Sequence, residues 1–162
     1  MSAIKTPWDY GAGTSEHSQQ VALFMWAARA EHYGFDIAND LNYWQFNKSG
    51  LDMLSDRKPV PALHWLHAIP NGGMRSKATA SNLVAEGVKK GVYDIFWPVT
   101  CKMFAGLYIE MKKPGTITAK RDSRTPEQKA FGTFLDEMGY AHVYCDNWEP
   151  AAWRIQSHWF LR

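Results

Sequence analysis

A short run of sequence, GLYIEMKK at residues 106–113, constrains the fold of this chain more than any other feature. Its apolar and aromatic composition predicts a strand. Successive side chains of a strand point to opposite faces, so Glu110 and Lys112 share one face while Lys113 points to the other. A carboxylate and an ammonium on one face of an otherwise apolar strand indicate either a solvent-facing edge or a site with a chemical role.

A second strand-like run, GVYDIFW at residues 91–97, also carries an acid, Asp94. Two neighbouring buried carboxylates are costly unless a cation joins them, and Mg²⁺ is commonly held by one or two carboxylates. The two acids therefore predict a divalent-metal site, in which Lys112 orients or deprotonates a bound water or neutralises charge on a phosphate. The alternative is a solvent-facing pair of Glu110 and Lys112 on an edge strand.

Helix and strand signals alternate along the chain and predict an α/β fold, a mixed sheet flanked by helices, in a single domain of residues 1–162. Helix patterns occupy residues 14–29, 76–87, 125–139 and 149–161, and strand patterns occupy residues 63–69, 91–97, 106–113 and 140–145. Thr125 is the expected N-cap of the third helix, where Gln128 completes a capping box. Gly87 and Gly139 are the expected C-terminal stops of two helices.

Residues 30–61 show no sustained periodicity and carry many turn formers, so we expect a long connection, an insertion with a short helix at most. A connection of this length suggests a lid, a wrapping insertion or a dimer contact. Aromatic side chains concentrate at interfaces, which makes Trp44 and its neighbours in residues 43–46 a candidate dimer contact. The alternative is that these rings cover the core of their own domain.

Basic residues gather in the middle of the chain, where eleven Lys and Arg stand against five Asp and Glu between Arg75 and Lys129. Such a segment is typical of a surface that binds a polyanion, although a solvated charged face is equally compatible with it. No apolar run reaches the roughly 18 residues of a membrane span, and we expect a cytoplasmic protein without membrane contact. The two cysteines fit neither a zinc site nor a disulfide framework.

The sequence PNGG predicts a second contact with phosphate, because Asn71, Gly72 and Gly73 can expose backbone N–H groups while Arg75 and Lys77 add charge. An ordinary turn at the end of a strand is the alternative. The full set of expected DNA contacts is Asn71, Gly72, Gly73, Arg75, Lys77, Lys89, Lys90 and Lys113.

Four motifs in this order and spacing resemble the VRR-NUC nucleases, a branch of the PD-(D/E)XK superfamily, in its small stand-alone phage and bacterial form. The motifs are HAIPNGGMR, AEGVKKGVYDIFWP, GLYIEMKKPG and TPEQKAF, and the resemblance runs from Glu16 to about Ile155. The family commonly has proline at the position of Tyr93, whose side chain on a strand points away from the face of Asp94.

The resemblance implies a restriction-endonuclease-like core of order α-β-β-β-α-β that depends on Mg²⁺ or Mn²⁺. It makes Asp94, Glu110, Glu16 and the backbone carbonyl of Met111 the metal ligands. It also implies catalytic roles for Lys112 and Gln128, which match the catalytic lysine and the glutamine of the following helix. From the residues alone, Glu16 is equally an acid favoured by the helix dipole.

By the same resemblance, the expected activity is endonucleolytic hydrolysis of DNA, selective for four-way (Holliday) junctions or branched DNA, in phage or bacterial replication, recombination or repair. Some members of the family act as homodimers. Three alternatives remain at this point: a nuclease of restriction or exonuclease type, a nucleic-acid-binding module that does not cleave, and a structural protein whose aromatic surfaces bind protein partners.

Overall fold

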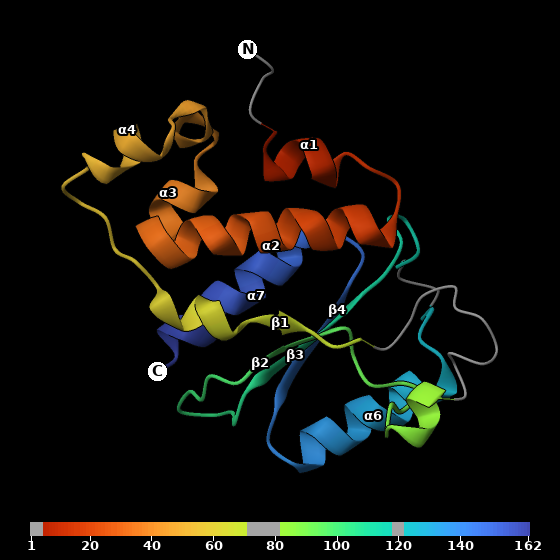
Figure 1. The fold of residues 1–162 in the computed structure, drawn as a ribbon. Helices are drawn as coiled ribbons and strands as arrows, with labels where there is room; N and C mark the ends of the chain where they lie inside the picture. Colours follow the sequence, from red (N-terminus) through yellow and green to blue (C-terminus); the bar gives the residue numbers. More distant parts are fainter. Residues whose placement is uncertain (1–4, 71–81, 118–121) are drawn as a thin grey trace.

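The structure is a computed structural model that describes residues 5–70, 82–117 and 122–162 (Figure 1). The expected DNA contacts in the PNGG region, Asn71, Gly72, Gly73, Arg75 and Lys77, lie outside the described residues. Of the helix expected at residues 76–87, the structure describes only the end, which is helical at residues 82–85 and is followed by Gly87 with φ of +97°.

Four strands form one mixed sheet in the order β1 (His67–Ala68), β2 (Ile95–Trp97), β3 (Leu107–Met111) and β4 (Ala141–Cys145). The first three strands pair antiparallel, and β3 pairs parallel with β4. Parallel neighbours need a crossover connection, which helix α6 (Pro126–Glu137) supplies between β3 and β4.

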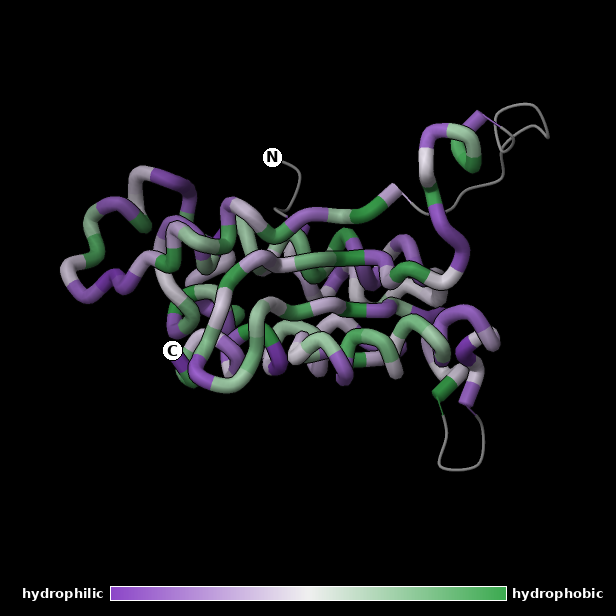
Figure 2. The backbone as a smooth tube through the Cα atoms, turned by 90° about the horizontal axis from the view of Figure 1, so that it is seen from below, coloured by the Kyte–Doolittle hydropathy of each residue, from purple (hydrophilic) through white to green (hydrophobic). Residues whose placement is uncertain are grey.

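Helices cover both faces of the sheet, with α2 (Glu16–Tyr33) and α7 (Trp148–Phe160) on one side and α6 on the other (Figure 1). Along each strand, side chains contact the helices on one face of the sheet and then, at the next residue, the helix on the other face. Ile95 and Ile109 are fully buried in the main core with residues of α2 and α7, whereas Tyr108 packs edge-on against Phe131 of α6. Hydrophobic stretches accordingly run through the middle of the molecule in Figure 2.

Capping interactions define the helix ends. Ser15 caps α2 through the N–H of Ser18, and Thr125 caps α6 in a full capping box with Gln128. Gly139 follows α6 with φ of +72°, a conformation that glycine adopts at no steric cost. A helix that the sequence analysis missed, α1 (Pro7–Gly11), begins with another capping box, from Thr6 to Asp9.

The strand expected at residues 63–69 is much shorter than predicted. A 3-10 helix, η2 (Pro61–Trp65), occupies its first half, and only β1 is paired. Pro61 fixes φ at the first helical position, and the turn buries Leu63 while Ala62 accepts a hydrogen bond of 2.8 Å from the Trp97 indole. Burial against the sheet therefore decides this conformation.

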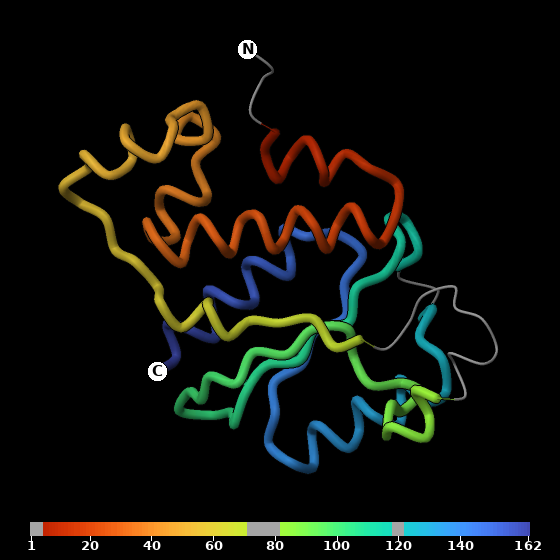
Figure 3. Tube along the Cα trace, in the orientation of Figure 1, coloured from red at the N-terminus to blue at the C-terminus, as the bar shows by residue number. Residues whose placement is uncertain are grey.

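Residues 30–61 contain more regular structure than expected. Helix α2 continues to Tyr33, and three short elements follow, α3 (Phe35–Asn39), η1 (Leu41–Gln45) and α4 (Lys48–Asp52). They fold over the C-terminal end of α2 (Figure 3). No helix in the described part of the chain has both the length and the hydropathy needed to cross a membrane.

The proposed dimer contact at Trp44 is wrong, because Trp44 belongs to the core of its own domain. Its side chain is only 4% exposed, and its indole N–H donates a hydrogen bond of 3.1 Å to the carbonyl of Ala38. The guanidinium of Arg29 lies 4.0 Å from the ring centroid. Of the segment 43–46 proposed as the contact, the structure thus excludes Trp44, whereas Phe46 is 47% exposed.

Candidate active site

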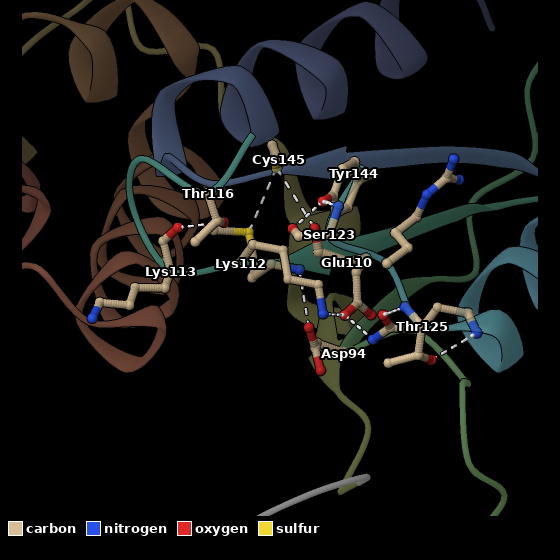
Figure 4. Close-up of polar contacts among 12 residues, drawn as sticks. Asp94, Glu110, Lys112, Lys113, Thr116, Ser123, Thr125, Tyr144 and Cys145 are labelled. Carbon is tan, nitrogen blue, oxygen red and sulfur yellow. Dashed lines mark hydrogen bonds and ion pairs between the residues drawn. The ribbon is translucent and has the colours of Figure 1, made fainter. Parts of the chain in front are cut away.

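Glu110 and Lys112 leave the C-terminal end of β3 and meet in a buried ion pair. Lys112 Nζ lies 2.6 Å from Glu110 Oε1, and the two side chains are 16% and 1% exposed. Lys113 is exposed and points away from the pair (Figure 4). The structure therefore confirms that Glu110 and Lys112 share a face and that Lys113 points away from it.

Asp94, which lies just before β2, also has its side chain at the C-terminal end of β3. It lies one residue before β2, not within the strand as expected, at a bend whose carbonyl accepts a hydrogen bond of 2.7 Å from Ile69. Its carboxylate oxygen Oδ2 accepts a hydrogen bond of 2.9 Å from the N–H of Met111. Because the N–H and C=O of one strand residue face the same neighbouring strand, the carbonyl of Met111 also faces Asp94.

Gln128 connects the capping box of α6 with this site. Its Oε1 accepts a hydrogen bond of 3.0 Å from the Thr125 N–H, and its Nε2 donates to Glu110 Oε1. The backbone donor at Thr125 fixes which end of the amide is the oxygen, so Gln128 must present its NH₂ group to Glu110. Gln128 therefore both completes the cap of α6 and contacts Glu110.

Glu16 lies in the first turn of α2, exposed at the rim of the site. Partial burial, followed by the charge of Asp94, raises its pKa, and Lys112 opposes the shift. The start of α2 is held by Gln19, a buried residue that the sequence analysis missed. Its amide group donates to the carbonyls of Gly11 and Gly13 and accepts a hydrogen bond from Trp148 N. Nothing in the local sequence distinguishes Gln19 from a surface glutamine.

Burial and mutual repulsion govern the charges of the site. Burial, followed by the charge of Asp94, raises the pKa of Glu110 to about 7. Burial also raises the pKa of Asp94, although the Met111 N–H and Lys112 oppose the shift. Burial alone would lower the pKa of Lys112, but its bond to Glu110 and the nearby acids outweigh that effect and raise it. Lys112 therefore stays protonated at neutral pH.

The donor set fits a hard divalent cation. Glu110 Oε2 is buried without a hydrogen-bond partner among the described residues, and such an orphaned oxygen is a costly feature in a protein interior. Two carboxylates and one carbonyl are oxygen ligands of the kind that Mg²⁺ prefers. Within residues 5–70, 82–117 and 122–162, no three or more His, Cys, Asp or Glu side chains converge as a metal cluster, so the structure does not bring Glu16 into one such group with Asp94 and Glu110.

Two of the expected DNA-contacting lysines lie near the N-terminus of α6. Lys89 and Lys90 are exposed, and Lys90 is close enough to Glu127 to lower its pKa, although hydrogen bonds have the larger effect. Gly91 makes this approach possible. It has φ of +85°, and a Cβ there would lie 2.5 Å from the backbone of Glu127. The segment that leads to Asp94 thus packs directly against the helix that carries Gln128.

A further group of side chains, on β4 and just before α6, was not expected from the sequence. Arg124 pairs with Asp122 at 3.0 Å, and the hydroxyl of Tyr144 accepts a hydrogen bond of 3.0 Å from Ser123 N. Tyr144 stands opposite Glu110 in the register of β3 and β4. These contacts join segments that are distant in sequence, so local patterns give no signal for them.

The order α2-β1-β2-β3-α6-β4, with the charged side chains at the ends of the central strands, defines a restriction-endonuclease-like α/β fold, as the sequence predicted. The fold is similar to that of a solved structure described as a VRR_NUC domain protein, with a TM-score of 0.61 and 23% sequence identity. The similarity covers 93% of this chain and 92% of the other. No known family and no curated protein matches the sequence.

Proposed function

We propose that this protein is a metal-dependent endonuclease that hydrolyses phosphodiester bonds in DNA. One observation carries the proposal. Asp94 binds the N–H of Met111, the residue after Glu110, and Glu110 bears a buried oxygen without a partner among the described residues, beside the ammonium of Lys112. A buried ion pair with an unpaired oxygen beside it is costly to maintain for stability alone. The similarity in fold to the VRR_NUC domain protein supports the same class of reaction.

Asp94, Glu110 and the carbonyl of Met111 would hold Mg²⁺ or Mn²⁺, with Glu16 at the open side of the site. When bound, such an ion polarises a phosphoryl oxygen and lowers the pKa of a coordinated water. Gln128 fixes the orientation of the Glu110 carboxylate through the hydrogen bond to Oε1. The protein residues thereby define where the scissile phosphate would lie.

Lys112 would act as a cation in this reaction. Its pKa is raised, so its Nζ carries a proton at neutral pH and is a poor general base in the free protein. Of the roles that the sequence left open, orientation of the attacking water and stabilisation of the charge that develops on the phosphate fit this protonation state best. Lys89, Lys90 and Lys113 are exposed and would contact the DNA backbone.

We further propose branched DNA, such as a four-way junction, as the substrate, in phage or bacterial replication, recombination or repair in the cytoplasm. Such a junction has two symmetric scissile phosphates, and a twofold homodimer with one site in each protomer would present two sites to them. Light scattering at micromolar concentration tests this assembly. A monomer that cuts junctions symmetrically would overturn the dimer.

The decisive test is a cleavage panel of duplex, nicked, flap, single-stranded and four-way DNA, each with Mg²⁺, Mn²⁺ or EDTA. We expect internal cuts in branched DNA with either metal and none with EDTA. Cleavage only from ends would indicate an exonuclease, and cleavage of plain duplex at one sequence would indicate a restriction-type enzyme. Salt-dependent binding without any cleavage would favour a DNA-binding module.

A further inference from the structure

We propose that Tyr93, Arg124 and Gly132 form a brace behind the site, in which Tyr93 and Arg124 act as positioning residues for Asp94 and Gln128. The role in cleavage rests on the proposed function, whereas the brace itself is a packing arrangement that stability measurements test independently. None of the three residues belongs to the expected ligand set.

Tyr93 is the first member of the brace and directly precedes Asp94. Its side chain is fully buried, and its ring packs edge-on against Phe131 of α6 and His142 of β4, with centroids 5.5 and 5.7 Å away. The alternation expected for a strand does not apply here, because β2 begins only at Ile95. Tyr93 instead holds the bend at Asp94 against the helix that carries Gln128.

Arg124 is the second member and directly precedes Thr125, the N-cap of α6. Burial raises the pKa of the Tyr93 hydroxyl and the adjacent Arg124 guanidinium opposes this shift. The Nε and Nη2 of Arg124 donate to the two oxygens of Asp122 at 3.1 and 3.0 Å. Its guanidinium also lies 5.2 Å from the ring centroid of Tyr144. One side chain thus links the residue before Asp94 with the start of the helix that supplies Gln128.

Gly132 gives independent evidence that the Tyr93 hydroxyl occupies a defined position against α6. It lies buried inside α6, where glycine is less favourable than alanine. A Cβ at this position would lie 2.9 Å from the Tyr93 hydroxyl, closer than real side chains approach, whereas His142 Cε1 and Arg124 Nη1 would be at 3.5 and 3.7 Å. The glycine therefore makes room for the hydroxyl of Tyr93.

Tyr93 and Arg124 each stand next to a segment that contacts β3 at or beside Glu110. Asp94 contacts β3 through the N–H of Met111, and Gln128 binds Glu110 Oε1 directly. If the brace loosens, both groups gain freedom relative to Glu110. Residues that orient metal ligands typically change metal affinity or activity by about 10–100-fold when they are replaced.

A double-mutant cycle of Tyr93→Phe and Gly132→Ala tests the packing. Gly132→Ala alone should lower Tm by roughly 3 °C or more, because the new methyl group collides with the hydroxyl. In the Tyr93→Phe background the same change should leave Tm equal or higher, because the space is vacant and alanine favours the helix. An equal loss of Tm in both backgrounds would overturn the brace.

Single-turnover cleavage at a temperature where every variant is folded tests the positioning role. Tyr93→Phe and Arg124→Gln should each slow cleavage about tenfold, and the double variant should be little slower than either, since both break one link. DNA affinity without divalent metal should stay within about twofold of wild type. Tyr108→Phe, which removes a hydroxyl from the same face of the sheet, is the matched control.

An unchanged cleavage rate in both folded variants would overturn the positioning role and leave only a structural one. If the wild-type protein cleaves no DNA at all, the proposed function fails, while the Tm cycle still decides whether the brace exists. The two failures are therefore distinguishable in one set of proteins.

Discussion

Lys112 Nζ lies 2.6 Å from Glu110 Oε1, and both side chains leave the same end of strand β3. The pair is nearly buried, so it cannot be treated as a surface salt bridge of little consequence. A buried ion pair contributes little net stability after desolvation, which leaves chemistry as the better explanation for its presence.

Replacing Lys112 by alanine should slow single-turnover cleavage by about a hundredfold or more, the scale expected for a group that stabilises charge in the transition state. Lys113→Ala is the matched control, because Lys113 is adjacent, exposed and directed away from Glu110. It should weaken DNA binding modestly and leave the chemical step unchanged. A larger effect of Lys113→Ala on that step would show that the assigned roles are reversed.

Gln128 contacts both the helix cap and Glu110, and two variants should separate the effects of these contacts on stability and on cleavage. Thr125→Ala deletes only the helix cap and should cost about 1 kcal/mol of unfolding free energy, with cleavage retained. Gln128→Ala deletes the cap contact and the hydrogen bond to Glu110, so it should cost a similar amount of stability and also slow cleavage about tenfold. Equal cleavage rates for the two variants, measured in a time course, would contradict a role for Gln128 in the site.

The raised pKa of Glu110 predicts a pH dependence of stability. Because the folded-state pKa of about 7 exceeds the ordinary value of 4.5, the protonated form favours folding, and this contribution is lost as pH rises through about 7. Glu110→Gln cannot ionise, so in EDTA it should gain stability over wild type as pH rises. We expect the gap to widen by about 2 kcal/mol between pH 5 and pH 8.

Denaturant unfolding of both proteins at several pH values measures this gap. A constant difference from pH 5 to pH 8 would show that Glu110 ionises normally. Excess Mg²⁺ at pH 8 should stabilise the wild type but not Glu110→Gln, because the ion would compensate the buried charge.

Much of the fold could be predicted because its signals are local. The alternation in residues 106–113 fixes which side chains of β3 share a face, and the Thr125 capping box fixes the start of α6. The positions of Glu110, Lys112 and Gln128 follow from these two elements once the strands pair. The same capping signal at Thr6 would have found α1.

The parts that could not be predicted depend on tertiary contacts. The strand-like residues before His67 form a 3-10 helix because Leu63 is buried there. Trp44 is buried by its contacts with Arg29 and Ala38, which nothing in its neighbourhood indicates. Likewise, Tyr93 and Arg124 are electrostatic neighbours although they are distant in sequence, so no local pattern indicates their proximity.

The most direct test of the central claim is cleavage of four-way DNA by wild type, Asp94→Asn and Glu110→Gln in Mg²⁺ and in EDTA, with DNA affinity measured in parallel. We predict cleavage only by the wild type with Mg²⁺, together with similar DNA affinity for all three proteins, since lysine and arginine make most phosphate contacts. Near-normal turnover by a folded Asp94→Asn or Glu110→Gln protein, or undiminished wild-type cleavage in EDTA, would contradict the assignment of this site.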